Sequence, residues 1–191
     1  GEKYWQKYLR VMPKDGDKSN IEAHRYICES GDYFFYYDVN PFYVDTLDAF
    51  VIADFINEIY EPYYEKYGSS FDGFFTDEPQ ISRNGIPWSL TLIEKYQERY
   101  GEDLCAVLPS LFFEIGDYKT VRVKFWKLIT DLFSANFMKQ IFDWCNAHDL
   151  KFTGHLVLEE SLLAQLITNG GNIIMVQVEN EYGSYGNDKD Y

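Results

Sequence analysis

Short apolar runs alternate with amphipathic stretches along most of this chain. Residues 32–39 (DYFFYYDV) are rich in aromatic and apolar side chains, which is typical of a strand. With residues 21–30 across Gly31 they predict a hairpin or two consecutive strands. From Ile52 to Tyr63, apolar residues recur at i, i+3, i+4, i+7 and i+11, the spacing of a helix with one apolar face.

The ends of this helix also have signals in the sequence. Asp45 or Thr46 is expected to cap its start, Pro62 to kink or end it, and Gly68 to stop it. A second helix is expected after Ser89, ending at Gly101. Residues 104–116 are expected to form a loop with apolar anchors, and residues 120–148 keep helical spacing for more than six turns.

Three apolar runs end in polar side chains. Residues 71–79 (FDGFFTDEP), 150–156 (LKFTGHL) and 173–178 (IIMVQV) each predict a buried strand. The recurring order of helix, apolar strand and polar strand end predicts an α/β fold, and the parallel strands of a (β/α)8 (TIM) barrel explain it best. About five strands are recognisable, whereas such barrels typically need about 250 residues. We therefore expect residues 1–191 to form one barrel-like domain that is incomplete.

Composition narrows the classes of partner. The net charge of −14 at pH 7 and the lack of a basic run exclude nucleic acid and anionic membranes, and favour a neutral or cationic substrate. Aromatic residues make up 19% of the chain; they fit a bulky core, and some of them fit a carbohydrate site. No membrane span or signal peptide is recognisable, so localisation stays open. Open strand edges of an incomplete barrel would favour self-association.

The first candidate site is Asp77-Glu78, directly after the predicted strand at 71–76. In α/β barrels and open parallel sheets, substrates bind at this end of a strand. Glycosidic bond cleavage requires one carboxylic acid to protonate the leaving oxygen and a second carboxylate as nucleophile or base. Glu78 at the end of a buried strand fits the acid, since burial favours a protonated carboxyl group. The alternative is an acid that only caps a helix or lies in a loop.

The second candidate site is Glu179-Asn180-Glu181 after the strand at 173–178. Strand alternation puts the two carboxylates on one side and the amide on the other. The amide suits a hydrogen bond to a sugar hydroxyl, while a solvated loop is the alternative reading. These three residues are candidates for catalysis or substrate binding.

The third candidate site is His155, with Glu159 and Glu160 close behind it. His155 at a strand end fits substrate contact or a hydrogen-bonded structural role better than a metal site, because metal sites need three or four ligands with a recognisable spacing. Trp88 is a further candidate for sugar contact. Neither a Gly-rich phosphate loop nor a G-x-S-x-G elbow is present, so no cofactor and no metal are expected.

Two family resemblances divide the chain. Residues 168–191 (TNGGNIIMVQVENEYGSYGNDKDY) closely resemble the fourth-strand segment of family-35 β-galactosidases. This resemblance implies a retaining enzyme with Glu181 as general acid/base and Asn180 in contact with the sugar. It also implies a nucleophilic Glu on a much later strand, beyond the last residue of this sequence.

Residues from about 40 to 165 resemble instead the (β/α)8 hydrolases related to α-L-rhamnosidases. The motifs that carry this resemblance are YVDTLD, GFFTDEPQ, IPWS, YQERYGEDL and FDWCNAHDLKFTGHLVLEE. In that group the DEP segment is similar to a fourth-strand acid, which would make Glu78 its counterpart.

A natural barrel is not expected to contain two fourth-strand motifs. We therefore expect a chimera or a fragment, with a junction near residues 164–169. The sequence predicts a retaining glycoside hydrolase acting on an oligosaccharide or glycoside, with Glu181 or Glu78 as acid/base. The alternative is a catalytically silent α/β module that binds carbohydrate or serves as a scaffold.

Overall fold

The computed structural model describes residues 2–13, 24–28, 31–81 and 85–155. Its strands form a four-stranded antiparallel sheet in the order β2-β3-β1-β5 and a separate parallel pair of β4 and β6. The strands are β1 (Trp5–Pro13), β2 (His24–Cys28), β3 (Gly31–Val44), β4 (Gly73–Thr76), β5 (Ile86–Trp88) and β6 (Lys151–Gly154).

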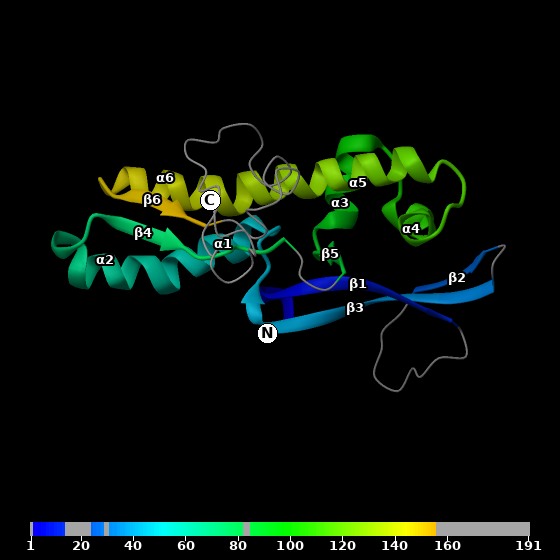
Figure 1. The fold of residues 1–191 in the computed structure, drawn as a ribbon, viewed down its shortest axis with the longest axis horizontal. Helices are drawn as coiled ribbons and strands as arrows, with labels where there is room; N and C mark the ends of the chain where they lie inside the picture. Colours follow the sequence, from blue (N-terminus) through cyan, green and yellow to red (C-terminus); the bar gives the residue numbers. More distant parts are fainter. Residues whose placement is uncertain (1, 14–23, 29–30, 82–84, 156–191) are drawn as a thin grey trace, which may run out of the picture.

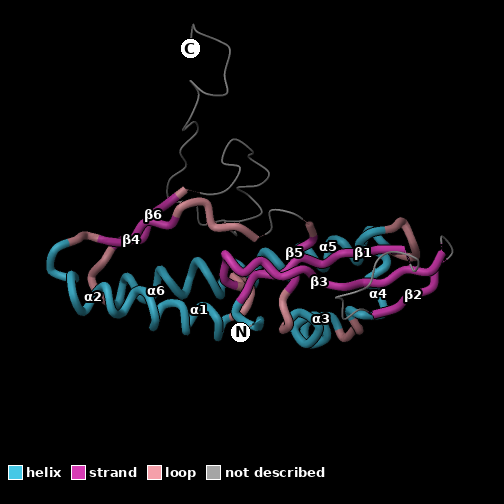
Figure 2. Tube along the Cα trace, turned by 90° about the horizontal axis from the view of Figure 1, so that it is seen from below, coloured by secondary structure: helices cyan, strands magenta, loops and turns pink. Residues whose placement is uncertain are grey.

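The helical segments are the α-helices α1 (Ala49–Phe55), α2 (Glu61–Tyr67), α3 (Leu92–Tyr100), α4 (Leu104–Phe112), α5 (Tyr118–Leu132) and α6 (Gln140–Ala147), the π-helical turns η2 (Ile56–Tyr60) and η4 (Phe133–Lys139), and the short 3-10 helices η1 (Glu2–Tyr4) and η3 (Gly68–Ser70). The path α5–η4–α6 runs along most of the molecule (Figure 1). The helix α4 lies between α5 and the antiparallel sheet and α3 crosses α5, while α1, α2, β4 and β6 gather around α6 (Figures 1 and 2).

The hairpin expected around Gly31 is confirmed, since β2 pairs antiparallel with β3. The strand β3 is longer than expected, because it continues through residues 40–44. In the sheet, β1 lies between β3 and β5. The expected buried strands at 71–79 and 150–156 are present as β4 and β6 and are parallel. Their expected burial is wrong, because most of their side chains are partly or fully exposed.

The helix expected after residue 47 is interrupted by one π-helical turn. The carboxylate of Asp48, rather than Asp45 or Thr46, caps its start by accepting from the backbone N–H groups of Phe50 and Val51. Because η2 contains an extra residue per turn, the apolar face passes from Ile56 to Tyr60, which is 6% exposed. Ile59 and Tyr63, expected on the buried face, are instead 45% and 58% exposed.

The expected loop at 104–116 is wrong over its first part, because Leu104–Phe112 forms α4. Asp103 caps this helix by accepting from the N–H of Cys105. Leu104, Leu108 and Leu111 are buried, and this apolar face outweighs the helix-breaking tendency of Pro109. The expected helix at 120–148 is confirmed as the path α5–η4–α6, and its buried side chains belong to the hydrophobic core shared with the sheet.

These described elements establish an α/β arrangement. Its parallel part is limited, over the described ranges, to β4 and β6, and a closed barrel is not visible there. The strand expected at 173–178 and the junction expected at 164–169 lie outside the described residues.

Candidate functional site at the ends of β4 and β6

The parallel pairing of β4 with β6 brings two of the candidate residues together. The register aligns Thr76 with Gly154, so the next residues, Asp77 and His155, leave the same edge. The backbone N–H of His155 donates to the carbonyl of Thr76 over 3.0 Å. The His155 Nδ1 lies 3.7 Å from Asp77 Oδ1. The carboxylate and the imidazole therefore form one polar edge at the carboxyl ends of parallel strands.

Glu78 has an unusual backbone conformation directly after this edge. Its φ angle is 45°, in the left-handed region that residues other than glycine rarely adopt. Such outliers cost on the order of 1–3 kcal/mol and cluster at functional sites. The side chain of Glu78 is exposed, and that of Asp77 is 79% exposed. The burial expected for Glu78 from the sequence is therefore wrong, because β4 ends at the surface.

The chain after Glu78 is held by the antiparallel sheet. The N–H of Gln80 donates to the hydroxyl of Tyr43 over 3.3 Å. Its carbonyl accepts from Gln6 Nε2 at 2.8 Å and from the hydroxyl of Thr46 at 3.4 Å. Both backbone groups of Gln80 are thus bonded to side chains of β1, β3 and the turn after β3. This clamp fixes where the segment carrying Asp77 and Glu78 returns to the core.

Tyr43 belongs to the electrostatic surroundings of the same site. Burial raises the pKa of the Tyr43 hydroxyl above its ordinary value, the hydrogen bond from Gln80 opposes this, and the charges of Asp77 and Glu78 raise it further. Sequence reasoning missed Tyr43, because the strand expected at residues 32–39 ends four residues before it. Its proximity to the two carboxylates depends on contacts more than 30 residues apart, for which the local pattern contains no signal.

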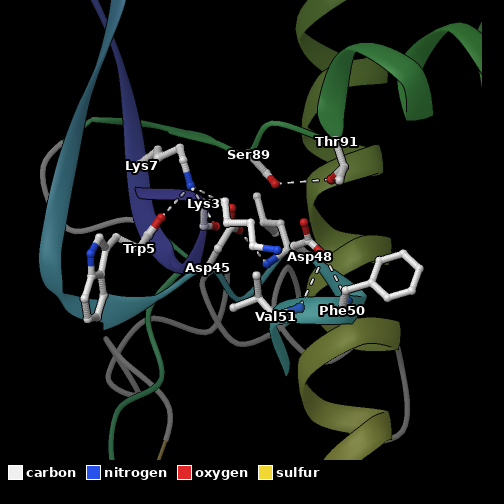
Figure 3. Close-up of polar contacts among 10 residues, drawn as sticks. Lys3, Trp5, Lys7, Asp45, Asp48, Phe50, Val51, Ser89 and Thr91 are labelled. Carbon is white, nitrogen blue, oxygen red and sulfur yellow. Dashed lines mark hydrogen bonds and ion pairs between the residues drawn. The ribbon is translucent and has the colours of Figure 1, made fainter. Parts of the chain in front are cut away.

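A buried charged cluster joins the start of β1 to the turn after β3 (Figure 3). Lys7 is 0% exposed, and its ammonium group donates to the carbonyl of Trp5 at 2.6 Å and to Asp45 Oδ2 at 3.4 Å. Asp45 Oδ1 accepts from the N–H of Leu47. Burial raises the pKa of the Asp45 carboxyl group, opposed by the Lys7 ammonium and by the hydroxyl of Ser89. These bonds fix the turn between β3 and α1.

The remaining candidate residues do not join the strand-end site. Trp88 is 6% exposed and packs in the hydrophobic core, where β5 pairs with β1. Protein neighbours therefore occupy the surface that a sugar would need. The residues Glu159, Glu160, Glu179, Asn180 and Glu181 lie outside the described residues.

Within residues 2–13, 24–28, 31–81 and 85–155, no group of three or more His, Cys, Asp or Glu side chains is arranged to hold a metal ion. None of the helices described there has the length and apolar character required to cross a membrane.

Comparison with known proteins finds similarity to glycosidases over the C-terminal part. Residues 143–191 match the model of Glycosyl hydrolases family 35. Beta-galactosidase 1 of Dictyostelium discoideum is 85% identical over 26 residues, 14% of this chain and 4% of that protein. Beta-galactosidase 17 of Arabidopsis thaliana is 63% identical over 35 residues, 18% of this chain and 5% of that protein. The matched stretches thus span a small fraction of these curated relatives.

A rhamnosidase from Novosphingobium sp. PP1Y is similar in structure, with a TM-score of 0.49 and 15% sequence identity. The similarity covers 66% of this chain and 14% of the rhamnosidase. The family-35 match begins within α6, continues through β6 and includes His155. Over residues 143–191 this chain is therefore similar to glycoside hydrolases of family 35.

Proposed function

We propose that this chain is part of a glycoside hydrolase whose chemistry lies at the carboxyl ends of β4 and β6. The observation that carries the proposal is the strand-end edge formed by Asp77, Glu78 and His155. The strand β6 belongs to the segment that matches family 35, and β4, which presents the two acids, is its parallel neighbour. In α/β folds with parallel strands this edge is where catalytic groups gather.

The proposed reaction is retaining hydrolysis of a β-galactoside, because the curated relatives that this chain matches are β-galactosidases. Glu181 is proposed to protonate the leaving oxygen and then to activate water, while Asn180 and Glu179 contact the sugar. Asp77 and His155 would bind hydroxyl groups from the neighbouring strand ends. A retaining mechanism also requires a second carboxylate that attacks the anomeric carbon and is released again by water.

Glu78 is the alternative acid, by its position at the end of β4. If Glu78 is the acid, the substrate would follow the second resemblance and be an α-rhamnoside. The left-handed backbone of Glu78 supports a functional role for this residue. The hydrogen bond that Gln80 donates two residues later comes from its backbone and does not require an acid at position 78.

A second candidate function is carbohydrate binding without hydrolysis. The exposure of Asp77 and Glu78 favours it, because exposed carboxylates accept hydrogen bonds from hydroxyl groups but lack the burial that favours a general acid. The binding module and the hydrolase would share the same edge and differ in turnover.

The test measures hydrolysis of 4-nitrophenyl and methyl β-galactoside and of 4-nitrophenyl α-rhamnoside by the full chain. Glu181→Gln and Glu78→Gln are compared with Glu94→Gln, which changes an exposed acid of α3. Loss of the general acid should lower kcat/KM for the methyl β-galactoside by about 10²–10⁴-fold. The decrease in kcat/KM should be smaller for the nitrophenyl galactoside, because its leaving group needs little protonation.

The two candidate functions give different outcomes. Sugar binding without turnover in any variant would support the binding module over hydrolysis by this chain alone. Turnover that depends on Glu78 and not on Glu181 would move the acid to β4. Absence of both binding and turnover would reject both proposals.

A further inference from the structure

An open groove of about 440 Å³ lies between the beginning of the chain and the helical path α1–η2. Its walls come from η1, β3, α1 and η2, and none of Asp77, Glu78 and His155 lines it. Its volume lies within the range of about 300–1,000 Å³ that is typical of small-molecule sites. The groove is therefore a concave surface separate from the strand-end site.

The charge of the groove has one sign. Asp54 and Glu58 both line it, four positions apart on the helical path, and both are exposed. Among the residues that the structure describes, no Lys, Arg or His lines the groove. In the part of the chain that the structure describes, no ion pair involves either carboxylate. Like charges at this spacing repel each other, so a bound cation would relieve the repulsion.

The other walls are apolar and aromatic. Tyr4 and Phe55 line the groove with half-buried rings, next to Val44 and Val51. The ammonium group of Lys3 lies 4.9 Å from the centroid of the Tyr4 ring. This is within the distance at which a cation is attracted to an aromatic face. One ring of the groove thus already contacts an ammonium group of the chain itself.

The π-helical turn contributes to the shape of this groove. The turn η2 directs Tyr60 into the core and leaves Ile59 45% exposed, where it lines the groove beside Glu58. Single π-helical turns are rare and occur frequently at functional sites. A regular α-helix would bring Ile59 to the apolar face that starts at Ile52 and Ile56.

We propose that this groove binds a small organic cation, namely a primary ammonium group carried on an apolar or aromatic body. Asp54 and Glu58 attract the ammonium group, and the rings of Tyr4 and Phe55 contact the apolar body. Anions are repelled by the two carboxylates. A neutral molecule of the same shape would gain the apolar contacts but lose the charge interaction. This inference does not depend on the proposed glycosidase activity.

The test titrates the full chain with 2-phenylethylammonium chloride and with 2-phenylethanol, its neutral analogue, in low salt. Binding is followed by calorimetry and by NMR shifts of the backbone amides. We expect saturable binding of the cation below about 10 mM. We expect the alcohol to bind at least about fivefold more weakly. The cation should also lose affinity as salt is added.

The double variant Asp54→Asn/Glu58→Gln should bind both probes about equally, because only the charge term is removed. Glu65→Gln/Glu94→Gln makes the same change in net charge on α2 and α3, outside the groove, and should keep the preference for the cation. Phe55→Leu should weaken both probes. Thermal unfolding verifies that each variant is folded.

Four outcomes would overturn the proposal. These are equal binding of the two probes by the wild type, unchanged preference in Asp54→Asn/Glu58→Gln, shifts that map outside the groove, and absence of binding at 10 mM. Stronger binding of free galactose than of the ammonium probe at these residues would also overturn it and would assign the groove to sugars.

Discussion

Two pairs of ionisable side chains in this molecule have similar spacing and opposite surroundings. Lys7 Nζ and Asp45 Oδ2 are 3.4 Å apart, with side chains 0% and 2% exposed. His155 Nδ1 and Asp77 Oδ1 are 3.7 Å apart, but Asp77 is 79% exposed. The ammonium and carboxylate groups of the buried pair are hydrogen-bonded to other protein groups, whereas the carboxylate of Asp77 still faces solvent. Distance alone thus does not separate a structural pair from a candidate binding group; burial and the remaining hydrogen-bond partners do.

The largest expected effect tests this comparison directly. Lys7→Met leaves the Asp45 carboxylate buried without its cation, so the free energy of unfolding should fall by about 3–5 kcal/mol. Asp77→Asn should change it by less than about 1 kcal/mol, because the pair is exposed. Urea unfolding of the full chain measures both. Similar losses in the two variants would contradict the comparison, and Lys139→Met serves as the control for an exposed lysine in an ion pair.

A smaller effect on the free energy of unfolding is expected from adding a side chain where the backbones of β4 and β6 approach closely. The Cβ atom of an alanine at residue 73 would clash with the backbone carbonyl of Lys151. Gly73→Ala should therefore destabilise the chain by about 1–3 kcal/mol and separate the strands that carry Asp77 and His155. Urea unfolding measures the loss, and faster hydrogen exchange of the Lys151 amide, which donates to the Asp72 carbonyl, reports the separation.

The control for this variant is Lys151→Ala on the neighbouring strand, where the side chain is exposed. It should shift the free energy of unfolding by less than about 0.5 kcal/mol. If Gly73→Ala were as stable as this control, the close approach of the two backbones would not matter.

The smallest expected effect is a pH dependence. Burial raises the pKa of Asp45 in the folded chain above its ordinary value of 3.8, so the folded state binds a proton more readily than the unfolded state. The contribution of Asp45 to stability is thus fully present below pH 3.8 and is lost as pH rises through the folded-state pKa. The stability difference between wild type and Asp45→Asn should move in favour of the wild type as pH is lowered from 7 toward 4. A difference that is constant, or that moves the other way, would contradict a raised pKa.

Local sequence patterns predicted the elements better than their boundaries and surroundings. The paths through residues 49–67 and 118–147 were recognisable because apolar spacing continues over many turns. The π-helical turn η2 was not recognisable, since one extra residue rotates the following side chains around the helix axis without changing the types of residue. The helix α4 was missed because Pro109 favours a loop locally, while the burial of Leu104, Leu108 and Leu111 depends on the rest of the fold.

The strand-end site was predictable only where it depends on local sequence. Asp77 and His155 each follow a short apolar run, so their positions at strand ends could be inferred from neighbouring residues. Their closeness depends on the pairing of β4 with β6, whose partner residues are 78 positions apart in the sequence. The clamp on Gln80 depends on Gln6, Tyr43 and Thr46, which lie in or directly after the first strands. The burial of Glu78 could not be judged, because a short apolar run does not reveal whether its strand lies at the surface.

The π-helical turn η2 gives one continuous helical rod two different packing directions. Before the turn, α1 buries Ile52, and Asn136 of η4 donates its side-chain amide to the carbonyl of Leu47, in the turn that precedes α1. At the end of the turn, Tyr60 packs against Phe74 of β4 and Trp144 of α6, with ring centroids 4.3 and 5.5 Å away. The extra residue therefore rotates the buried face of the helix between two layers, the one packed on α1 and the one packed on Tyr60. An insertion or deletion of one residue in this stretch would rotate one layer relative to the other, whereas the same change in an exposed loop would not.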